Sequence, residues 1–482
     1  MKSQSLIIPF LFFMVNVLLR WIGIEINSLA GDEPFSVYFA QMDISDIVRH
    51  LKSGNNPPLY EILLHYWIRI WGIEEVVVRI PSLIFTALTA SYIYSIGHRF
   101  FNQQVGVVSA TVFTFSNYAT LFAHEARVYA LFGLLTTMSF YYFLKWLNGM
   151  DKRWDSFFMV IIYGVLLYAH YFGLMVVGIH VLLALGLNKG KSPLKKYGLV
   201  LAMSLVLFAP YILIVVGRAM DTFQVGTWLT PPNGWLSMSY VLTLFFNSYQ
   251  LVISLIFGTL LIGILSVRRS HQVHQNSIVI IAWFLIPLLG MFGISYYLPM
   301  FHDRYLMHSF MGGCLFVGVL FYALPVRKLM SGALAGIFLS VFIFHSKRNI
   351  DNGRHSAQAI EKVQSLRDES TRVVLYPKYN MIGYAYYFNR DRFRQYDDEY
   401  GYYKLVEGFK DENIYGINQY SEARIDSTCC QKLLFMMTDA GPKVELLAAF
   451  GDTHSLMDSF HYPAIIDVFV FERDQYMNSS LE

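Results

Sequence analysis

The chain has 482 residues, of which 55% are hydrophobic, 17% aromatic and only 15% charged. A soluble domain carries roughly 25% charged residues, so this composition argues against disorder, a repeat array or an ordinary cytosolic enzyme. It is typical of a polytopic membrane protein with a modest water-soluble part. The formal net charge of +3 says little by itself. Three Cys are too few for a disulfide scaffold, and the adjacent Cys429 and Cys430 lack metal-ligand spacing.

Apolar runs long enough to span a bilayer, about 20 residues each, recur through the first three quarters of the chain. Eleven spans are predicted, at 6–24, 79–97, 105–122, 128–147, 155–171, 173–187, 198–216, 249–267, 277–297, 305–323 and 329–346. The segment around 235–247 is a candidate short or re-entrant piece. The first run also has a signal-peptide interpretation, but its length and the Arg20-Trp21 pair near its end favour a span.

The positions of the basic residues predict the orientation of these spans. One set of connections carries most of them, and the positive-inside rule places this set in the cytoplasm. The set is Lys2, His98-Arg99, Lys145, Lys152-Arg153, Lys189, Lys191, Lys195-Lys196, Arg268-Arg269 and Arg327-Lys328. The outer face then receives the loops 25–78 and 217–248 and the turns 123–127 and 298–304. The compact loops favour a bacterial inner membrane with a periplasmic outer face, and the endoplasmic reticulum is the alternative.

Residues 347–482 differ from the rest because charges are frequent and apolar runs are short. Strands are predicted at 372–376, 432–437 and 465–471, and a helix at 355–369. The chain is therefore divided into a transmembrane domain, 1–346, and a C-terminal α/β domain of ordinary size, 347–482, on the outer face.

The first outer loop is too long for a plain connection and contains helix-like stretches at 33–52 and 58–72. In the second stretch, Glu61, His65 and Arg69 recur at four-residue spacing beside apolar residues. This pattern predicts an amphipathic helix that lies at the membrane interface.

Two adjacent carboxylates, Asp32 and Glu33, begin this loop. Such a pair can hold a metal, bind a polar substrate or supply a general base. The alternative is helix capping, with Asp32 as N-cap and Pro34 in the first turn.

Two further polar clusters fall at the same outer boundary, namely His124-Glu125-Ala126-Arg127-Val128-Tyr129 and His302-Asp303-Arg304-Tyr305. Charged groups at membrane depth are costly and suggest function, and Arg suits phosphate. The alternatives are a Glu125–Arg127 ion pair, a snorkelling Arg, or salt bridges from Asp303 to Arg304 or Arg127. His170-Tyr171 also ends on this face. Acids beside basic groups at one boundary indicate group transfer from a phospholipid-type donor.

These motifs resemble those of the GT-C glycosyltransferase superfamily, in the branch of the protein O-mannosyltransferases and the lipid A aminoarabinose transferase (glycosyltransferase family 39/83 type). In order, they are Asp32-Glu33, Asn56-Pro57-Pro58-Leu59-Tyr60, Arg79-Ile80-Pro81-Ser82, Glu125-Ala126-Arg127-Val128-Tyr129-Ala130-Leu131 and Arg304-Tyr305-Leu306. The resemblance covers about residues 1–345. It implies many transmembrane helices with interfacial helices in the first outer loop, a donor sugar on polyprenyl phosphate, and inverting transfer on the outer face.

The resemblance also implies roles for single residues. Asp32 takes the place of the catalytic or metal-associated carboxylate, with Glu33 beside it. The expected donor- or acceptor-binding residues are Glu125, Arg127, Tyr129, Arg304, Tyr305, Tyr60 and His65. A divalent metal is an open option, with Asp32, Glu125 and His302 as its candidate ligands.

The expected partners are a polyprenyl-phosphate sugar, membrane lipid, and a glycolipid, polysaccharide or protein acceptor, without nucleic acid. The rival functions are a transporter or flippase of lipid-linked sugars and a non-catalytic scaffold. A transporter more often shows internal repeats and charges at the bilayer midplane, and the sequence shows neither.

Overall fold

The computed structural model describes residues 4–52, 54, 56–188, 190–265, 271–347, 350–394, 401–419, 422, 430–438, 453–462 and 466–474. The basic residues Lys2, Lys189 and Arg268-Arg269, the thiol of Cys429, and the first residue of the strand predicted at 465–471 lie outside the described residues.

The chain forms two compact units. Unit 1 comprises Met1–Ile24, Val48–Leu63 and Arg79–Ile350. Unit 2 comprises Glu25–Ile47, Leu64–Val78 and Asp351–Glu482. The boundary between the two units near the C-terminal domain lies at residues 350–351, close to the predicted domain boundary at 346–347. Two segments of the first outer loop, however, belong to the same unit as the C-terminal domain.

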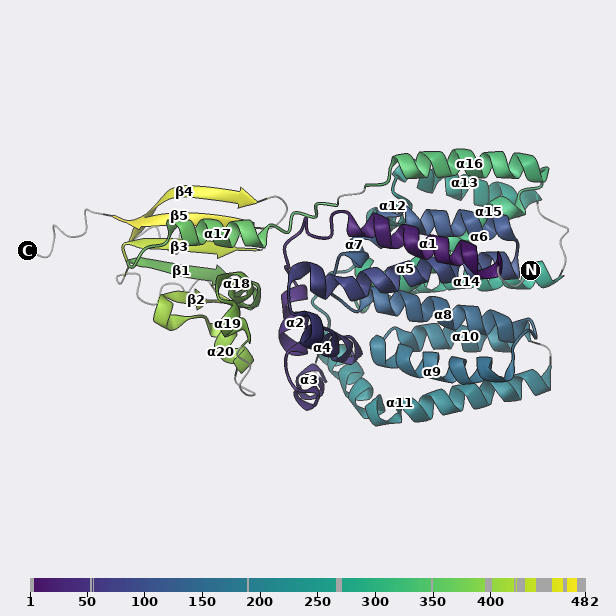
Figure 1. Cartoon of the computed structure of the whole chain (residues 1–482), viewed down its shortest axis with the longest axis horizontal. Coiled ribbons are helices and arrows are strands. Elements are labelled where there is room, and N and C mark those ends of the chain that lie inside the picture. Colours follow the sequence, from purple (N-terminus) through teal and green to yellow (C-terminus); the bar gives the residue numbers. More distant parts are fainter. Residues whose placement is uncertain are drawn as a thin grey trace, which may run out of the picture. The chain divides into compact units, whose positions relative to one another are not determined.

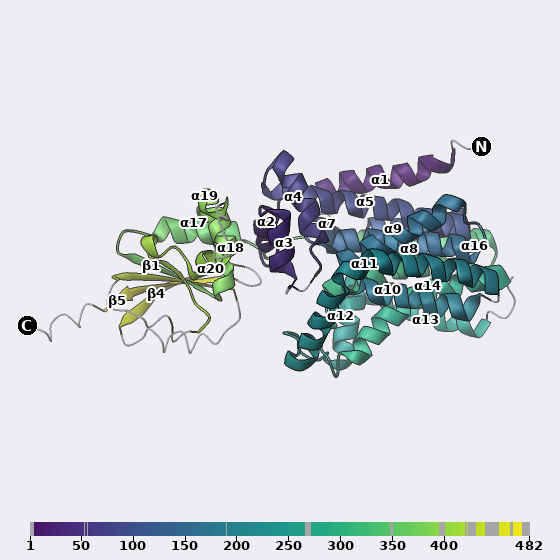
Figure 2. The same cartoon turned by 90° about the horizontal axis from the view of Figure 1, so that it is seen from below.

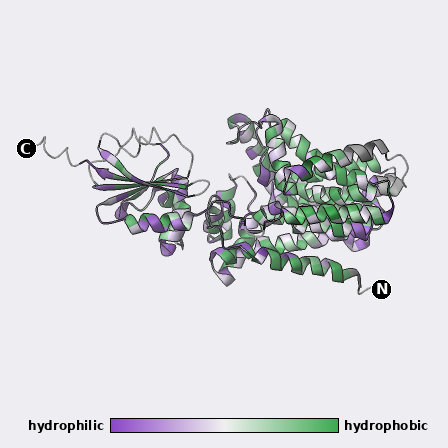
Figure 3. Ribbon diagram, turned by 90° about the horizontal axis from the view of Figure 1, so that it is seen from above, coloured by the Kyte–Doolittle hydropathy of each residue, from purple (hydrophilic) through white to green (hydrophobic). Residues whose placement is uncertain are grey.

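Unit 1 is a bundle of helices, in which α8, α9 and α10 lie side by side (Figure 1). Its helices are α1 (Gln4–Trp21), α5 (Glu75–Phe100, whose first residues belong to unit 2), α6 (Gln103–Thr114), α7 (Asn117–Ala123), α8 (Tyr129–Leu147), α9 (Arg153–Ala169), α10 (Gly173–Leu187), α11 (Lys191–Val225), α12 (Gly234–Phe246), α13 (Tyr249–Leu265), α14 (His271–Ile294), η1 (Asp303–Leu306), α15 (Met307–Ala323) and α16 (Lys328–Phe344). Every predicted span coincides with one or two of these helices, and apolar residues predominate along them (Figure 3). The predicted polytopic helical fold is confirmed.

Length and apolarity alone identify fewer spans than the eleven predicted. Within the described residues, four helices are long and apolar enough to cross a membrane, at Glu75–Phe100, Ser192–Val225, Gln275–Ile294 and Asp303–Ala323. Two bent pairs raise the number to six if each is one span: α6 with α7, bent by 59°, and α12 with α13, bent by 96°. The second bend includes the short piece predicted around 235–247. Helices such as α10 and α16 are apolar but shorter than the roughly 20 residues that a bilayer requires.

Two glycines allow α15 to pack closely against its neighbours. A Cβ at Gly312 would lie 2.8 Å from the backbone N of Phe284 on α14. A Cβ at Gly318 would lie 2.9 Å from the carbonyl O of Val105 on α6. Small residues permit this backbone approach, which is a common packing device between membrane helices.

Unit 2 contains a five-stranded sheet with the order β2-β1-β3-β5-β4. The strands are β1 (Thr371–Tyr376), β2 (Ile414–Gly416), β3 (Lys432–Met437), β4 (His454–Tyr462) and β5 (Ile466–Arg473). β1 pairs in parallel with β2 and β3, while β5 is antiparallel to β3 and β4. Helices α17 (Ser356–Leu366) and α18 (Met381–Phe388) lie on one side of this sheet (Figure 2). The predicted α/β domain is confirmed, and its described part also contains α19 (Arg390–Arg394) and α20 (Gly401–Glu407).

Hydrogen bonds join the first-loop segments to the C-terminal domain inside unit 2. Ser28 N donates to Arg354 O at 2.8 Å. The hydroxyl of Tyr387 accepts from Leu29 N at 2.6 Å and donates to Glu75 Oε1 at 2.7 Å. Burial and the nearby Glu75 charge raise the pKa of Tyr387, so the hydroxyl keeps the proton that it donates. The segment that carries Asp32 and Glu33 is therefore held by the C-terminal domain.

Candidate functional site

The outer turn between α7 and α8 carries Arg127. Its backbone N donates to Glu125 O at 2.8 Å, and both side chains are buried. Nη1 of Arg127 lies 3.8 Å from Oε1 of Glu61, and these two side chains are only 9% and 8% exposed. Glu61 comes from α4 (Leu59–Trp71), which begins directly after Pro57-Pro58. The sequence had marked Glu61 only as part of a polar stripe, so this buried ion pair is a new feature of the site.

Tyr60 is connected to the same turn through Ser82. Its hydroxyl lies 3.4 Å from Ser82 Oγ, and Ser82 Oγ donates to the carbonyl O of Arg127 at 3.5 Å. Tyr60 and Ser82 are both fully buried. The candidate binding residue Tyr60 therefore positions the Arg127 turn.

The late cluster is organised around Asp303. Its Oδ1 lies 2.5 Å from His302 Nδ1 and accepts from Arg304 N at 2.7 Å. The guanidinium of Arg304 lies 5.2 Å from the ring centre of Trp228 and 5.5 Å from that of Tyr305. Aromatic faces hold a guanidinium in one orientation and leave its N–H groups at the ring edge.

His170 connects the two arginine clusters. It is 2% exposed and stacks between Phe132 and Phe172, with ring centres 4.7 and 5.1 Å away. Its ring centre also lies 6.2 Å from that of Tyr129, two residues after Arg127, and 6.1 Å from that of Tyr305, the residue after Arg304. Two turns that lie far apart in the sequence therefore meet at one histidine. Its only sequence signal was a weak one, namely its place at the outer end of a predicted span.

Two tyrosines complete the connection between the clusters. Tyr118, on the helix α7 that precedes the Arg127 turn, donates from its hydroxyl to Asp303 O at 2.6 Å. The buried ring of Tyr129 has its centre 6.2 Å from that of His170. Tyr118 was missed because a tyrosine in an apolar helix looks like ordinary packing.

The first-loop carboxylates belong to unit 2. Asp32 is the N-cap of α2 (Glu33–Ala40), but its side chain makes no capping hydrogen bond. Its carboxylate therefore does not perform the capping role that was the alternative to function. Glu33 is 1% exposed, and its Oε2 lies 3.7 Å from Nη1 of Arg354.

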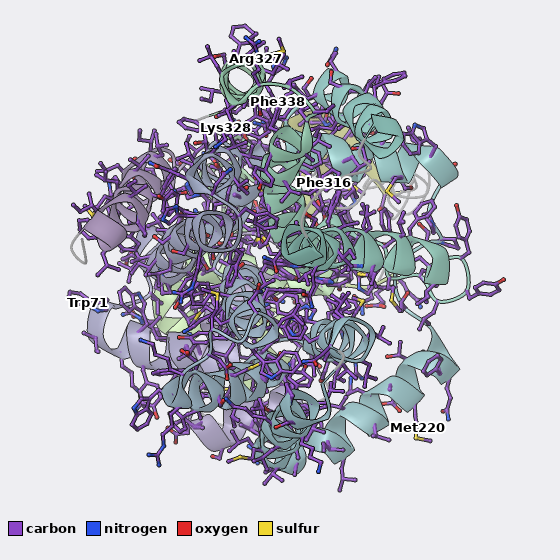
Figure 4. All side chains as sticks on the ribbon, turned by 90° about the vertical axis from the view of Figure 1, so that its right-hand side faces the viewer. Trp71, Met220, Phe316, Arg327, Lys328 and Phe338 are labelled. Carbon is purple, nitrogen blue, oxygen red and sulfur yellow. The ribbon has the colours of Figure 1, made fainter. Side chains whose placement is uncertain are left out.

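Helix α4 has one buried face, which includes Glu61 and His65, and one exposed face that carries large apolar side chains. His65 is 1% exposed, and its Nδ1 lies 2.9 Å from Ala40 O, so it joins α4 to α2. Arg69 lies 3.4 Å from Asp43. In contrast, Ile70 and Trp71 are 73% and 61% exposed, and Trp71 points outward in Figure 4. An exposed apolar face is the property expected of an interfacial helix.

The candidate metal ligands do not belong to one unit of the chain. Among the residues that the structure describes, no group of three or more His, Cys, Asp or Glu side chains is placed to hold a metal ion. Asp32 belongs to unit 2, whereas Glu125 and His302 belong to unit 1. We therefore derive no chemistry through a metal.

An apolar groove of about 590 Å³ lies in unit 1 among α12, α13, α14 and α15. Trp235, Phe246, Phe292 and Phe316 are among its lining residues. Phe316 projects from α15, and Arg327 and Lys328 lie at the start of α16 (Figure 4). The groove lies at the 96° bend of the chain between α12 and α13. Its lining suits a long hydrocarbon chain.

Helices long and apolar enough to cross a membrane, with polar clusters at the turns between helices, define a polytopic membrane protein. Residues 55–214, about a third of the chain, match the family model of the dolichyl-phosphate-mannose-protein mannosyltransferases. Among curated protein sequences, none matches this chain.

Solved structures show the same fold at low sequence identity. The chain is similar to ArnT from Cupriavidus metallidurans in the apo state, with a TM-score of 0.60, 11% identity and 98% coverage of both chains. The same enzyme bound to undecaprenyl phosphate gives 0.58 at 10% identity, covering 95% of this chain and 97% of that one. The archaeal oligosaccharyltransferase AglB from Archaeoglobus fulgidus, in complex with an inhibitory peptide and a dolichol-phosphate, gives 0.51 at 11% identity, covering 98% and 75%. With the family match, these folds confirm the predicted resemblance to the GT-C superfamily.

Proposed function

We propose that this protein is a membrane glycosyltransferase that uses a polyprenyl-phosphate-linked sugar. The observation that carries the proposal is that the turn with Arg127 and the turn with Arg304 both lie against His170, through Tyr129 and Tyr305. Two arginines on turns that converge in this way suit the phosphate of a lipid-linked donor. The description of the matching family, and the undecaprenyl phosphate and dolichol-phosphate bound in the similar structures, support this donor class.

The proposed reaction is a single displacement on the outer, periplasmic face of a cell inner membrane. Asp32 takes a proton from an acceptor hydroxyl as that oxygen attacks the anomeric carbon of the sugar. The bond from this carbon to the phosphate oxygen breaks, and the phosphate leaves with the bonding electrons. Arg127 and Arg304 stabilise its growing negative charge. Glu33 or Glu125 orients the acceptor, and the sugar configuration is inverted.

The lipid tail of the donor is proposed to occupy the apolar groove among α12–α15. With the lipid tail in this groove, the phosphate attached to the end of the tail would lie at the outer boundary of the membrane. The acceptor is a hydroxyl or phosphate of a glycolipid, polysaccharide or protein.

The proposal is tested by following the release of free polyprenyl phosphate with purified protein in detergent. Donor pools with hexose and pentose sugars are supplied with a mixed acceptor extract, and the product is measured by mass spectrometry. We expect release by the wild type and its loss in Asp32→Asn. The matched control is Asp43→Asn, which alters an exposed carboxylate of the same loop and should keep activity.

Two results would change the assignment. Near-normal release by Asp32→Asn would move catalysis to another residue, with Glu33 and Glu125 next to test. No release by folded wild type with varied acceptors would favour the rival transporter of lipid-linked sugars, which is measured by sugar movement across vesicles.

A further inference from the structure

A separate cavity of about 180 Å³ lies entirely within unit 2. Its walls include residues that follow β1, such as Asn380 and Gly383, and residues at the end of β3, such as Thr438. The chain leaves β1 to form β2 on one side, and β3 pairs on the other side of β1. The cavity is therefore at the carboxyl ends of two parallel strands where the strand order reverses. Open α/β sheets bind their ligands at this point.

The lining of the cavity combines one cation with neutral hydrogen-bonding groups. Arg354 supplies the guanidinium, and Ser356, Asn380 and Thr438 supply hydroxyl and amide groups. No carboxylate is among the lining residues. Ser356 is also the first residue of α17, an 11-residue helix whose N-terminal dipole favours negative charge. This chemistry is complementary to an oxyanion.

The polar groups around the cavity are held in place. Asn380 Nδ2 donates to Tyr376 O at 3.1 Å and to Thr438 Oγ1 at 2.6 Å, which ties the two strand ends together. Tyr384 accepts from Gln364 Nε2, and burial raises its pKa, so its hydroxyl keeps a proton. A preformed polar site costs less ordering on binding than a flexible one.

The segment with the candidate catalytic acids forms one wall of this cavity. Ala30 and Gly31 line it, and they directly precede Asp32 and Glu33. Arg354, which lines the cavity, is also the partner of Glu33 at 3.7 Å. An anion in the cavity would therefore contact the guanidinium that also pairs with this acid segment.

We infer that this cavity binds a compact oxyanion, a phosphate or carboxylate group carried on the acceptor, and so brings the acceptor to Asp32. The volume exceeds by several times the roughly 30 Å³ of one water molecule, so the cavity has room for such a group. The acceptor role rests on the proposed transferase function, whereas oxyanion binding does not.

Oxyanion binding is measured by equilibrium dialysis of the full-length protein in detergent with radiolabelled glucose 1-phosphate. Unlabelled inorganic phosphate, glucuronate and glucose serve as competitors. We expect phosphate, glucuronate or both to displace the probe and glucose not to displace it. Competition by phosphate but not glucuronate would assign the site to phosphate. Equal competition by glucose would overturn the proposal, because the site would then recognise a neutral sugar.

Two kinds of variant test whether the probe occupies this cavity. Gly383 lines the cavity, and an added Cβ there meets only Pro34 Cγ, at 3.6 Å, so Gly383→Leu can be accommodated at the backbone and should narrow the cavity. The double variant Glu33→Gln with Arg354→Gln removes the cation without leaving its partner carboxylate unpaired. Both should weaken probe binding at least tenfold. Gly336→Leu, at a site in unit 1 where an added Cβ meets nothing within 4 Å, should bind as the wild type.

The outcome for the cavity is separable from the outcome for the transferase. Unchanged probe binding in both folded cavity variants, or no probe binding to the wild type, would overturn this inference while donor release is judged in its own assay. If donor release is confirmed, Gly383→Leu should raise the acceptor KM at least tenfold.

Discussion

The buried pair of Glu61 and Arg127 allows the proposed phosphate site to be tested by charge removal. The charged atoms lie 3.8 Å apart, and each side chain is less than a tenth exposed. Removing one partner of such a pair costs about 3–5 kcal/mol, because the other charge stays buried with less compensation. We therefore expect Glu61→Gln and Arg127→Gln each to lower the free energy of unfolding by about this amount. The double variant should lose clearly less than the sum, with a coupling of at least ~1 kcal/mol.

The two single variants should lose similar free energies of unfolding but differ in their catalytic activity. If Arg127 binds the donor phosphate, Glu61 competes with that phosphate for the same guanidinium. Glu61→Gln should then keep donor turnover, with an unchanged or lower donor KM. Arg127→Gln should lose about 10²-fold or more in kcat/KM, the usual effect of removing one preorganised group from a developing negative charge.

The assay combines thermal unfolding in detergent with release of polyprenyl phosphate. Arg69→Gln is the control, because Arg69 lies on the same helix, is 58% exposed and pairs with Asp43. It should change neither quantity by much, as exposed pairs contribute little. If the double variant recovers turnover as well as stability relative to Arg127→Gln, then Arg127 acts only as the partner of Glu61. The proposed phosphate role would then be wrong.

Two further predictions concern stability. Gly318→Leu should destabilise unit 1 by several kcal/mol, because even its Cβ would lie 2.9 Å from Val105 O. We expect a lower unfolding temperature for this variant. An unchanged unfolding temperature would contradict the close contact between the helices. In unit 2, hydrogen bonds from Ser370, Thr371 and Lys432 hold the pKa of Asp368 well below its usual range. A lowered folded-state pKa contributes stability that is fully present above the unfolded value of about 3.9 and is lost progressively as the pH falls from there through the folded-state pKa. Asp368→Asn should therefore be modestly destabilised at pH 7 and less so at pH 3, as measured by thermal unfolding, whereas an equal loss at both pH values would contradict this linkage.

The local sequence pattern predicted those helices and strands that are apolar along most of their length. Apolar runs located the helices of unit 1, and the apolar strands β1, β3 and β5 were predicted because they supply the core of the sheet. β4 was missed because it is an edge strand whose Leu456 and Met457 are exposed, with a register shift between Leu456 and Asp458. β2 was missed because it has only three residues.

The sequence identified residues of the candidate site but did not predict which of them lie against one another. Arg127 and Arg304 were identified because both fall at the outer ends of apolar runs, which is visible in one sequence. The convergence of their two turns on His170, and the pairing of Arg127 with Glu61, depend on packing between distant segments. Sequence spacing carries no information on such pairs unless the partners lie on the same helix or strand.

The C-terminal domain carries more of the proposed chemistry than the resemblance implied. The resemblance ended near residue 345, and the family match covers only 55–214. Yet the segment before Asp32 is held by Arg354 and Tyr387, and Pro34 after it lies against the position of Gly383. The local conformation of the proposed catalytic acid is therefore set by residues that the family pattern does not include. A hydrogen-bonded support of this kind is what a catalytic group requires to stay in position, which makes this domain part of the proposed catalytic machinery.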